Sequence, residues 1–397
     1  MKINPFDTSS ARNSGFSLFN LGFRPFYLGG ALFGAFAILL WINAFNNGAN
    51  IGKSGVIVGM LWHTHEMIFG FAGAIIAGFL LTAVRAWTGK DTPHGTPLAL
   101  IGLLWLAGRL LIWTGPEYSA AVVDCAFLPT VAIALLRVLI VAENRRNYFL
   151  AVALCTLGLL NMLFHWWASL GRFDLALRTA YVAIGLIIMF VAVIGGRVIP
   201  MFTTNAIPGF KLKQWKFIEK LAPLTVIFAF LADATHAPVW VIVTCAIIAV
   251  IIHSIRMLGW RSWAVGYRPI LTILHCAYVW IPAGFLILAL AALGFVSHSI
   301  AMHAFTVGAL GCAIVAMITR TALGHTGRML IAGTAEIWCY GLMLTSAFLR
   351  VFGPWFNSRN TLMWIGLASF CWIVALNIYV FKYAPFLIQP RTDGKSG

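Results

Sequence analysis

Long apolar stretches recur along the whole of this chain, and they restrict it to one kind of fold. Hydrophobic residues fill 61% of the 397 positions and charged residues only 10%, whereas soluble globular domains carry about a quarter charged residues. An apolar stretch of about 20 residues crosses a bilayer as a helix, because lipid offers no hydrogen-bond partner to an open backbone. The sequence therefore predicts an all-α fold, a polytopic bundle of transmembrane helices.

Twelve apolar runs have the length of a membrane span, with boundaries good to a few residues. They cover residues 26–46, 62–84, 97–114, 119–142, 148–169, 179–202, 217–234, 237–257, 268–292, 299–322, 330–352 and 361–385. Only a few residues around Ala234–Pro238 separate the seventh run from the eighth, so a count of eleven stays open. We expect a cytoplasmic segment over residues 1–24 without a cleavable signal peptide. A single transmembrane domain over 25–386 and a cytoplasmic tail over 387–397 follow, with no separate catalytic domain.

The basic residues predict the orientation of the bundle. With the N-terminus in the cytoplasm, 21 of the 27 Lys and Arg fall in inside segments and 5 in outside loops, and Arg109 stays within a span. The positive-inside rule therefore places both termini in the cytoplasm, in a bacterial inner membrane. The net charge of +16 adds attraction to the anionic lipid of the bilayer. No nucleic-acid partner is expected, because the basic residues are spread over short loops.

The seven cysteines exclude several kinds of site. Each falls in a different apolar run, and no two have C-x-x-C spacing, so neither a zinc knuckle nor a thioredoxin-type site is predicted. The C-x-x-C-H signature of covalent haem is absent as well. Any haem would therefore be held by side-chain ligands alone, and we interpret the cysteines as small packing residues.

Histidines within the runs are the best candidates for a functional site, because ionisable groups in a membrane are costly and mark function by default. Counting 1.5 Å per residue from the helix midpoints gives an outer group, roughly 9–15 Å outward of the midplane: His63, His65, His165 and His303. An inner pair lies roughly 7 Å inward: His253 and His275. The remaining four fall in inside loops (His94, His325) and outside loops (His236, His298).

The outer group predicts a copper site. Three neutral imidazoles, from His63, His65 and His303, suit copper, with His165 set apart. A His-x-His pair on a helix turns its rings about 200° apart, so His63 and His65 share one ion only if the segment is partly unwound. Otherwise one of them points elsewhere. Glu66, next to His65, is the candidate catalytic residue, as a relay for protons. The alternative is that these histidines only hydrogen-bond across helices.

The inner layer predicts a haem site, with His275 as an axial ligand. The alternative is that His275 only hydrogen-bonds across helices. Arg109 and Asp124 lie at nearly equal distances from the turn at Gly115–Pro116, so we expect a buried ion pair. A haem-propionate contact for Arg109 is the alternative. Arg197 and Arg320 lie at the inner ends of their spans, where snorkelling of the side chain toward the membrane surface explains their presence. The candidate cofactor-binding residues are His275, Arg109, Arg197 and Arg320.

Five segments carry a resemblance to a known family: residues 22–35, 62–89, 196–203, 274–288 and 303–328. WHTHEM and TRTALGHTGR are their most specific motifs. They resemble the NnrS family, haem- and copper-containing membrane proteins linked to nitric-oxide stress and denitrification. The resemblance implies haem b, copper and protection against nitric oxide, with no assignment of each histidine to one metal. The family's histidine motifs match at His63, His65, His275 and His303, with Glu66 and His325 as matched neighbours.

Three hypotheses for the function follow. The first is a haem/copper protein that binds or detoxifies nitric oxide, a gas that concentrates in lipid. If it is an enzyme, it is an oxidoreductase acting on nitric oxide, with an unknown electron donor. His275 and the outer group are about 20 Å apart along the membrane normal. Two separate sites, one for haem and one for copper, are therefore an alternative to an adjacent haem–copper pair. The second hypothesis is a transporter of a metal, haem or a small metabolite, and the third an assembly factor.

Overall fold

The computed structural model describes residues 15–48 and 57–394, and these residues form helices without a strand. Two helices are each built of three consecutive pieces, with a π-helix in the middle. The first runs through α2 (Met60–His65), η1 (Glu66–Ala72) and α3 (Gly73–Thr88). The second runs through α11 (His298–His303), η4 (Ala304–Gly311) and α12 (Cys312–His325). The others are α1 (Phe23–Asn46), α4 (Thr96–Thr114), α5 (Glu117–Val141), α6 (Tyr148–Ser169), α7 (Phe173–Ala206), α8 (Lys216–Ala234), α9 (Val239–Trp260), α10 (Pro269–Ala292), α13 (Thr334–Phe356) and α14 (Thr361–Ile388).

The predicted fold class is confirmed. Each of the twelve apolar runs corresponds to one continuous helix, and the seventh and eighth runs form two helices, α8 and α9. Among the described residues, 11 helices are long and apolar enough to cross a membrane. The exception is α8, which starts with the charged residues Lys216, Glu219 and Lys220. The chain is thus a multi-pass membrane protein.

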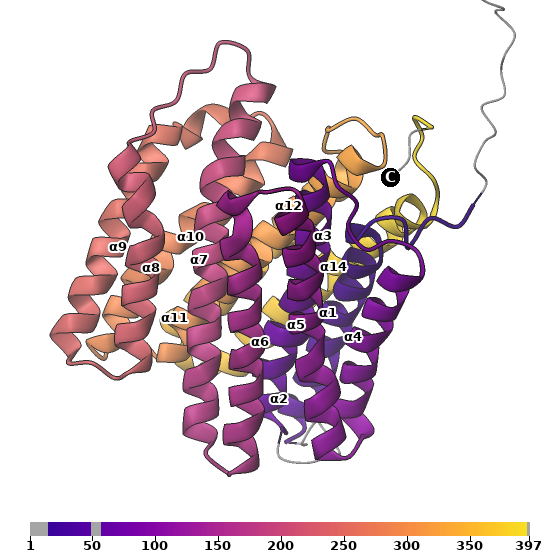
Figure 1. The fold of residues 1–397 in the computed structure, drawn as a ribbon. Helices are drawn as coiled ribbons and strands as arrows, with labels where there is room; N and C mark the ends of the chain where they lie inside the picture. The colour runs from indigo at the N-terminus through magenta and orange to yellow at the C-terminus, as the bar shows by residue number, and fades with distance from the viewer. Residues whose placement is uncertain (1–14, 49–56, 395–397) are drawn as a thin grey trace, which may run out of the picture.

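Helices that follow each other in the chain pack side by side, and α14 returns to pack against α1 and α13. In Figure 1, α8, α9 and α10 lie on one side of the bundle and α1, α4 and α14 on the other. The two interrupted helices, Met60–Thr88 and His298–His325, are the most buried ones. They therefore form the centre of the bundle, where a functional site is shielded from lipid.

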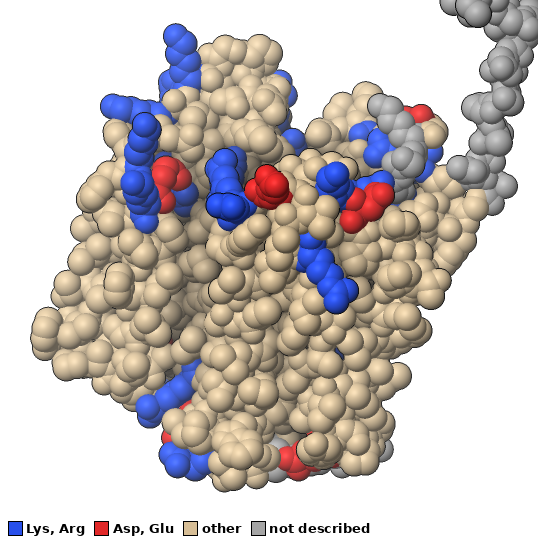
Figure 2. All heavy atoms as spheres, in the orientation of Figure 1, with Lys and Arg blue, Asp and Glu red and all other residues tan. Residues whose placement is uncertain are grey.

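The two ends of the described chain meet at one face. The Ser17 backbone N–H donates a hydrogen bond to the Ile388 carbonyl at 2.8 Å. Lys and Arg side chains gather at this face, above a broad uncharged band (Figure 2). By the positive-inside rule, this is the face that we expect to be cytoplasmic. Of the predicted N-terminal segment, residues 1–14 lie outside the described part of the chain, and the domain boundaries stay predictions.

The cysteines lie as predicted, each in a different helix. All seven are free thiols, and three of them are buried: Cys312, Cys339 and Cys371.

Candidate functional site

The His-x-His pair lies at the end of α2, where the chain continues into the π-helix η1 without a break. Since the segment stays helical, the two rings point to different sides. His63 lines a cavity, whereas His65 is fully buried among polar side chains of α5 and α6. The structure therefore brings His63 together with His303, and it places His65 elsewhere.

An outer cavity of about 130 Å³ lies between α1, α2, η1, α7, α11, η4, α13 and α14. Two histidine rings face each other across part of it: those of His63 and His303 are nearly parallel, with centroids 6.4 Å apart. The His63 ring also stacks on Trp41, with centroids 4.7 Å apart. Most of the remaining lining is apolar. The volume is close to that of an engineered apolar cavity of about 150 Å³ that holds one benzene, so the outer cavity accommodates a small ligand.

The hydrogen bonds of the two rings leave nitrogen atoms available. His303 Nδ1 lies 2.7 Å from the Ser299 carbonyl oxygen, so this nitrogen donates and Nε2 keeps its lone pair. This arrangement is the usual one for a metal-binding histidine. His63 Nδ1 is buried without a hydrogen-bond partner, which is costly unless a ligand satisfies it. Met60 and Met67 line the same cavity, so thioether and imidazole donors are present together.

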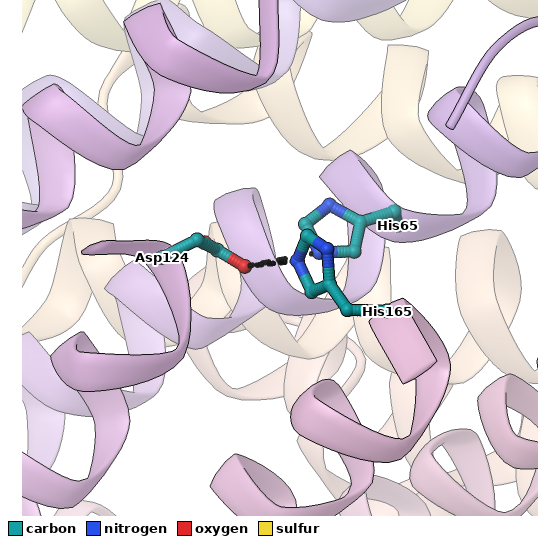
Figure 3. A group of neighbouring side chains, drawn as sticks. All are labelled: His65, Asp124 and His165. Carbon is teal, nitrogen blue, oxygen red and sulfur yellow. Dashed lines mark hydrogen bonds and ion pairs between the residues drawn. The ribbon is translucent and has the colours of Figure 1, made fainter. Parts of the chain in front are cut away.

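A second group of polar side chains is buried behind the outer cavity, and we name it the deep cluster. It consists of His65, Glu66, Arg109, Asp124, Asn161 and His165. Asp124 Oδ2 lies 3.1 Å from His65 Nε2 and 3.0 Å from His165 Nε2. Figure 3 shows the Asp124 carboxylate reaching toward both rings from α5. The deep cluster joins four helices that follow one another in the chain: the helix Met60–Thr88, α4, α5 and α6.

Arg109 pairs with both carboxylates of the deep cluster. Its guanidinium donates to Glu66 Oε2 at 2.6 Å and forms an ion pair with Asp124. The predicted Arg109–Asp124 pair is thus confirmed. Gly70 gives the guanidinium its room, because a Cβ there would lie 2.7 Å from Arg109 Nη1. With its carboxylate bound to Arg109 and to His65 Nδ1 at 3.0 Å, Glu66 belongs to the deep cluster and does not line the outer cavity.

The inner histidines are held by hydrogen bonds on both ring nitrogens. His275 Nδ1 lies 2.8 Å from Ser262 Oγ, and its Nε2 lies 3.1 Å from Thr203 Oγ1. His275 lines neither the outer cavity nor the smaller apolar cavity beside it. His253 Nδ1 lies 2.8 Å from the Tyr278 hydroxyl. As they stand, the surroundings of His275 do not fit a haem, which needs a free ring nitrogen and room for a macrocycle.

The two inner arginines also have partners in the protein. Arg197 donates to Asn147 Oδ1 at 3.0 Å, and its guanidinium lies over the Phe149 ring. Arg320 lies over the Phe202 ring, 3.9 Å from its centroid. Neither residue lines the outer cavity, so the structure does not bring these arginines to His63 and His303.

A family model describes nearly the whole chain: residues 17–391 match the model described as NnrS protein. The chain belongs to the NnrS family. The resemblance carried by the histidine motifs is thereby confirmed, and it makes the chain a membrane protein associated with the response to nitric oxide. No curated protein matches the chain.

The two central helices of this NnrS family member share a local pattern. In both, a histidine directly precedes a π-helix: His65 before η1 and His303 before η4. Glycines follow at the same spacing, five and eight residues later, at 70 and 73 and at 308 and 311. Since π-helical turns are rare and often lie at functional sites, the pattern marks both helices as site-forming.

Part of the deep cluster lies outside the site predicted from sequence. The copper prediction leaves out His165, although this residue lies in the same outer layer, and it does not include Asn161. Asn161 and His165 are four residues apart in one apolar run, so they lie on one face of a helix. A carboxylate in the neighbouring run, Asp124, completes the group. Polar residues on one face of adjacent spans were the available signal.

Proposed function

We propose that this protein is a copper-binding protein of the bacterial inner membrane that captures nitric oxide in the outer cavity. One observation carries the proposal: His63 and His303 line one largely apolar cavity, and His63 Nδ1 has no hydrogen-bond partner there. Family membership supports the link to nitric oxide. The detoxifying role and the inner-membrane location are part of the proposal.

The donor atoms of the outer cavity fit copper. Imidazole and thioether are ligands that copper prefers, and thioether in particular selects Cu(I). His63 and His303 would hold the ion, with Met60 and Met67 as further donors on the same wall. When bound, copper supplies a centre that takes up nitric oxide and exchanges an electron with it.

The other residues of the cavity shape and dry the site. Trp41 supports the His63 ring by stacking, and the Ser299 carbonyl fixes the orientation of His303. The lining is mostly apolar, with Arg350 and several hydroxyl side chains among it, and it admits a small neutral gas from the lipid.

Glu66 stays our candidate for handling protons. Because its carboxylate contacts His65 and Arg109, it would hold the proton shared with His65 Nδ1, without touching the ligand.

Haem has no part in this mechanism. The sequence predicts His275 as its ligand, but both ring nitrogens of His275 have hydroxyl partners. A haem at this position would have to displace Thr203 or Ser262. The visible spectrum of the purified protein tests this part of the prediction by the presence or absence of a Soret band.

Metal content and gas binding test the proposal together. Purified wild-type protein is expected to contain copper and to change its spectrum with nitric oxide. His63→Ala and His303→Ala are each expected to lose the copper and the change. His298→Ala is the matched control, because His298 lies on the same helix α11 but binds Asp233 at 2.9 Å instead. Full copper in both cavity variants would refute the site.

The kinetics of gas uptake then separate binding from turnover. Continuous consumption of nitric oxide with an added reductant would make the protein an oxidoreductase. Uptake of one equivalent per site would make it a binding protein. In both cases we expect the His303→Ala variant, which lacks the copper, neither to consume nor to take up nitric oxide.

Transport of the metal is the second candidate function. One observation favours it: two central helices each contain a π-helical turn next to the same cavity, and π-helical turns often lie at functional sites. Copper uptake into sealed vesicles containing the wild-type protein, abolished by His63→Ala, would support transport. Copper retained by the protein with no transfer across the membrane would exclude it.

A further inference from the structure

Two of the three donor–donor distances in the deep cluster are close to those that one metal ion imposes. Metal–nitrogen and metal–oxygen bonds of about 2.0–2.2 Å place two ligands of a tetrahedral ion about 3.3 Å apart. His65 Nε2 and His165 Nε2 lie 3.1 and 3.0 Å from Asp124 Oδ2, and all three atoms lie within 4.8 Å of one another. From this geometry we propose that His65, Asp124 and His165 bind a divalent transition-metal ion, at a site separate from the outer cavity.

The donor set distinguishes this ion from copper(I). Two imidazoles and one carboxylate suit borderline ions such as Zn²⁺, Co²⁺ or Fe²⁺, and such triads leave open positions for further ligands. Asn161 Oδ1, 2.9 Å from His65 Nε2, is placed to become a fourth ligand. No thioether lies among the cluster residues, in contrast to the outer cavity with Met60 and Met67.

The surroundings orient the ligands in advance. Metal-binding histidines usually donate their other ring N–H to a carboxylate or carbonyl, and His65 Nδ1 has Glu66 Oε1 at 3.0 Å. Arg109 binds this same Glu66 carboxylate and also Asp124. Glu66 therefore fixes the ring of His65, and Arg109 fixes the carboxylate of Asp124, through atoms that do not face the proposed metal ion. All of these groups are nearly or fully buried, so the geometry is protected from water.

The charge of the deep cluster calls for a cation. With both carboxylates ionised, Arg109 leaves one negative charge uncompensated, and a buried uncompensated charge is strongly destabilising. Every partner of the His65 ring nitrogens is a side-chain oxygen: Glu66 Oε1, Asp124 Oδ2 and Asn161 Oδ1. Either an extra proton on His65 or a metal ion at Nε2 fills this role. A divalent ion brings two positive charges where the deep cluster lacks one. One small anion bound at an open coordination position of the ion balances the second charge.

Cobalt binding tests the proposal, with the metal alone as the probe. Full-length protein, purified in detergent and stripped with a chelator, is titrated with Co²⁺ and followed by its d–d absorption and by elemental analysis. The primary variant is His165→Gln, because it removes a donor and leaves the carboxylates paired with Arg109. Losing even an outer partner of a metal ligand costs about 10–100-fold in affinity, so we expect a loss of at least about 100-fold.

Three controls keep the result interpretable. His65→Gln removes a second donor and must weaken Co²⁺ binding as well. His253→Gln changes a fully buried histidine outside the deep cluster, which binds Tyr278, and must leave binding unchanged. His303→Ala removes the outer copper site, so retained Co²⁺ binding there separates this proposal from the proposed function. Thermal unfolding of each variant confirms that it is folded.

The outcome is decided by the two donor variants. Co²⁺ bound by the wild type and lost in both donor variants supports the site. Wild-type protein without Co²⁺ or Zn²⁺ binding, or equal binding in the folded His165→Gln and His65→Gln variants, overturns it. The deep cluster would then be a hydrogen-bonded network balanced by a proton on His65.

Discussion

Removing the guanidinium of Arg109 is the sharpest test of the deep cluster. The Arg109→Met variant keeps an unbranched apolar stem but leaves the carboxylates of Glu66 and Asp124 without their cation. Both carboxylates are almost fully buried, with side chains 1% and 2% exposed. Loss of one partner of a buried pair destabilises a protein by about 3–5 kcal/mol. We therefore expect the free energy of unfolding to fall by about 4 kcal/mol.

The expected shift in melting temperature follows from the size of the chain. Unfolding entropy is about 2.1 cal/mol/K per residue, which gives about 0.8 kcal/mol/K for 397 residues. A loss of about 4 kcal/mol then lowers Tm by about 5 °C. A thiol-reactive dye measures this melting, because Cys312, Cys339 and Cys371 are buried in the folded protein.

A double-mutant cycle shows whether charge is the cause. Adding Asp124→Asn to Arg109→Met removes one of the two unpaired carboxylates, so it should restore part of the lost stability. Non-additivity of this kind is expected for residues in contact. If Arg109→Met melts within about 1 °C of the wild type, or if Asp124→Asn makes the double variant less stable, the description of the deep cluster as a charge-balanced network is wrong.

Three further predictions concern other parts of the bundle. Because both ring nitrogens of His275 are occupied, we expect His275→Ala to leave the visible spectrum unchanged; a Soret band lost in this variant alone would instead support the haem prediction from sequence. Gly70→Ala should destabilise the protein by about 1–3 kcal/mol by overpacking, whereas Gly73→Ala, whose Cβ would meet only atoms at 3.5 Å or beyond, should melt like the wild type. Glu336→Gln should cost about 1.5–3 kcal/mol in the same dye assay, because this buried carboxylate accepts a hydrogen bond from Lys382 at 2.7 Å; an unchanged Tm would show that the bond contributes nothing.

The helices could be predicted from sequence because hydropathy and length alone decide them. The Arg109–Asp124 pair was predictable for a related reason: two residues equally far from a tight turn come to the same depth on adjacent antiparallel helices. Both inferences need only positions along the membrane normal. They agree with the structure because consecutive helices pack side by side.

The composition of the site could not be predicted in the same way. Depth placed His63, His65, His165 and His303 in one layer, but only packing decides which helices are neighbours. Helix α6 brings His165 to the deep cluster, while η4 and α11 bring His303 to the outer cavity. The partners of His275 were equally hidden, since Ser262 lies in the connection between α9 and α10 and carries no apolar signal.

Because each of the two central helices contains a π-helix, the number of residues between its histidine and the glycines that follow must be kept to the single residue. In an α-helix each residue turns the chain by 100°, so removing one residue from η1 would rotate the segment before it relative to α3. His63 would leave the outer cavity and His65 would leave the deep cluster, although neither side chain had changed. The same holds for His303 and η4. Sequences that keep every histidine but alter the five- and eight-residue intervals to the glycines would therefore have lost both sites.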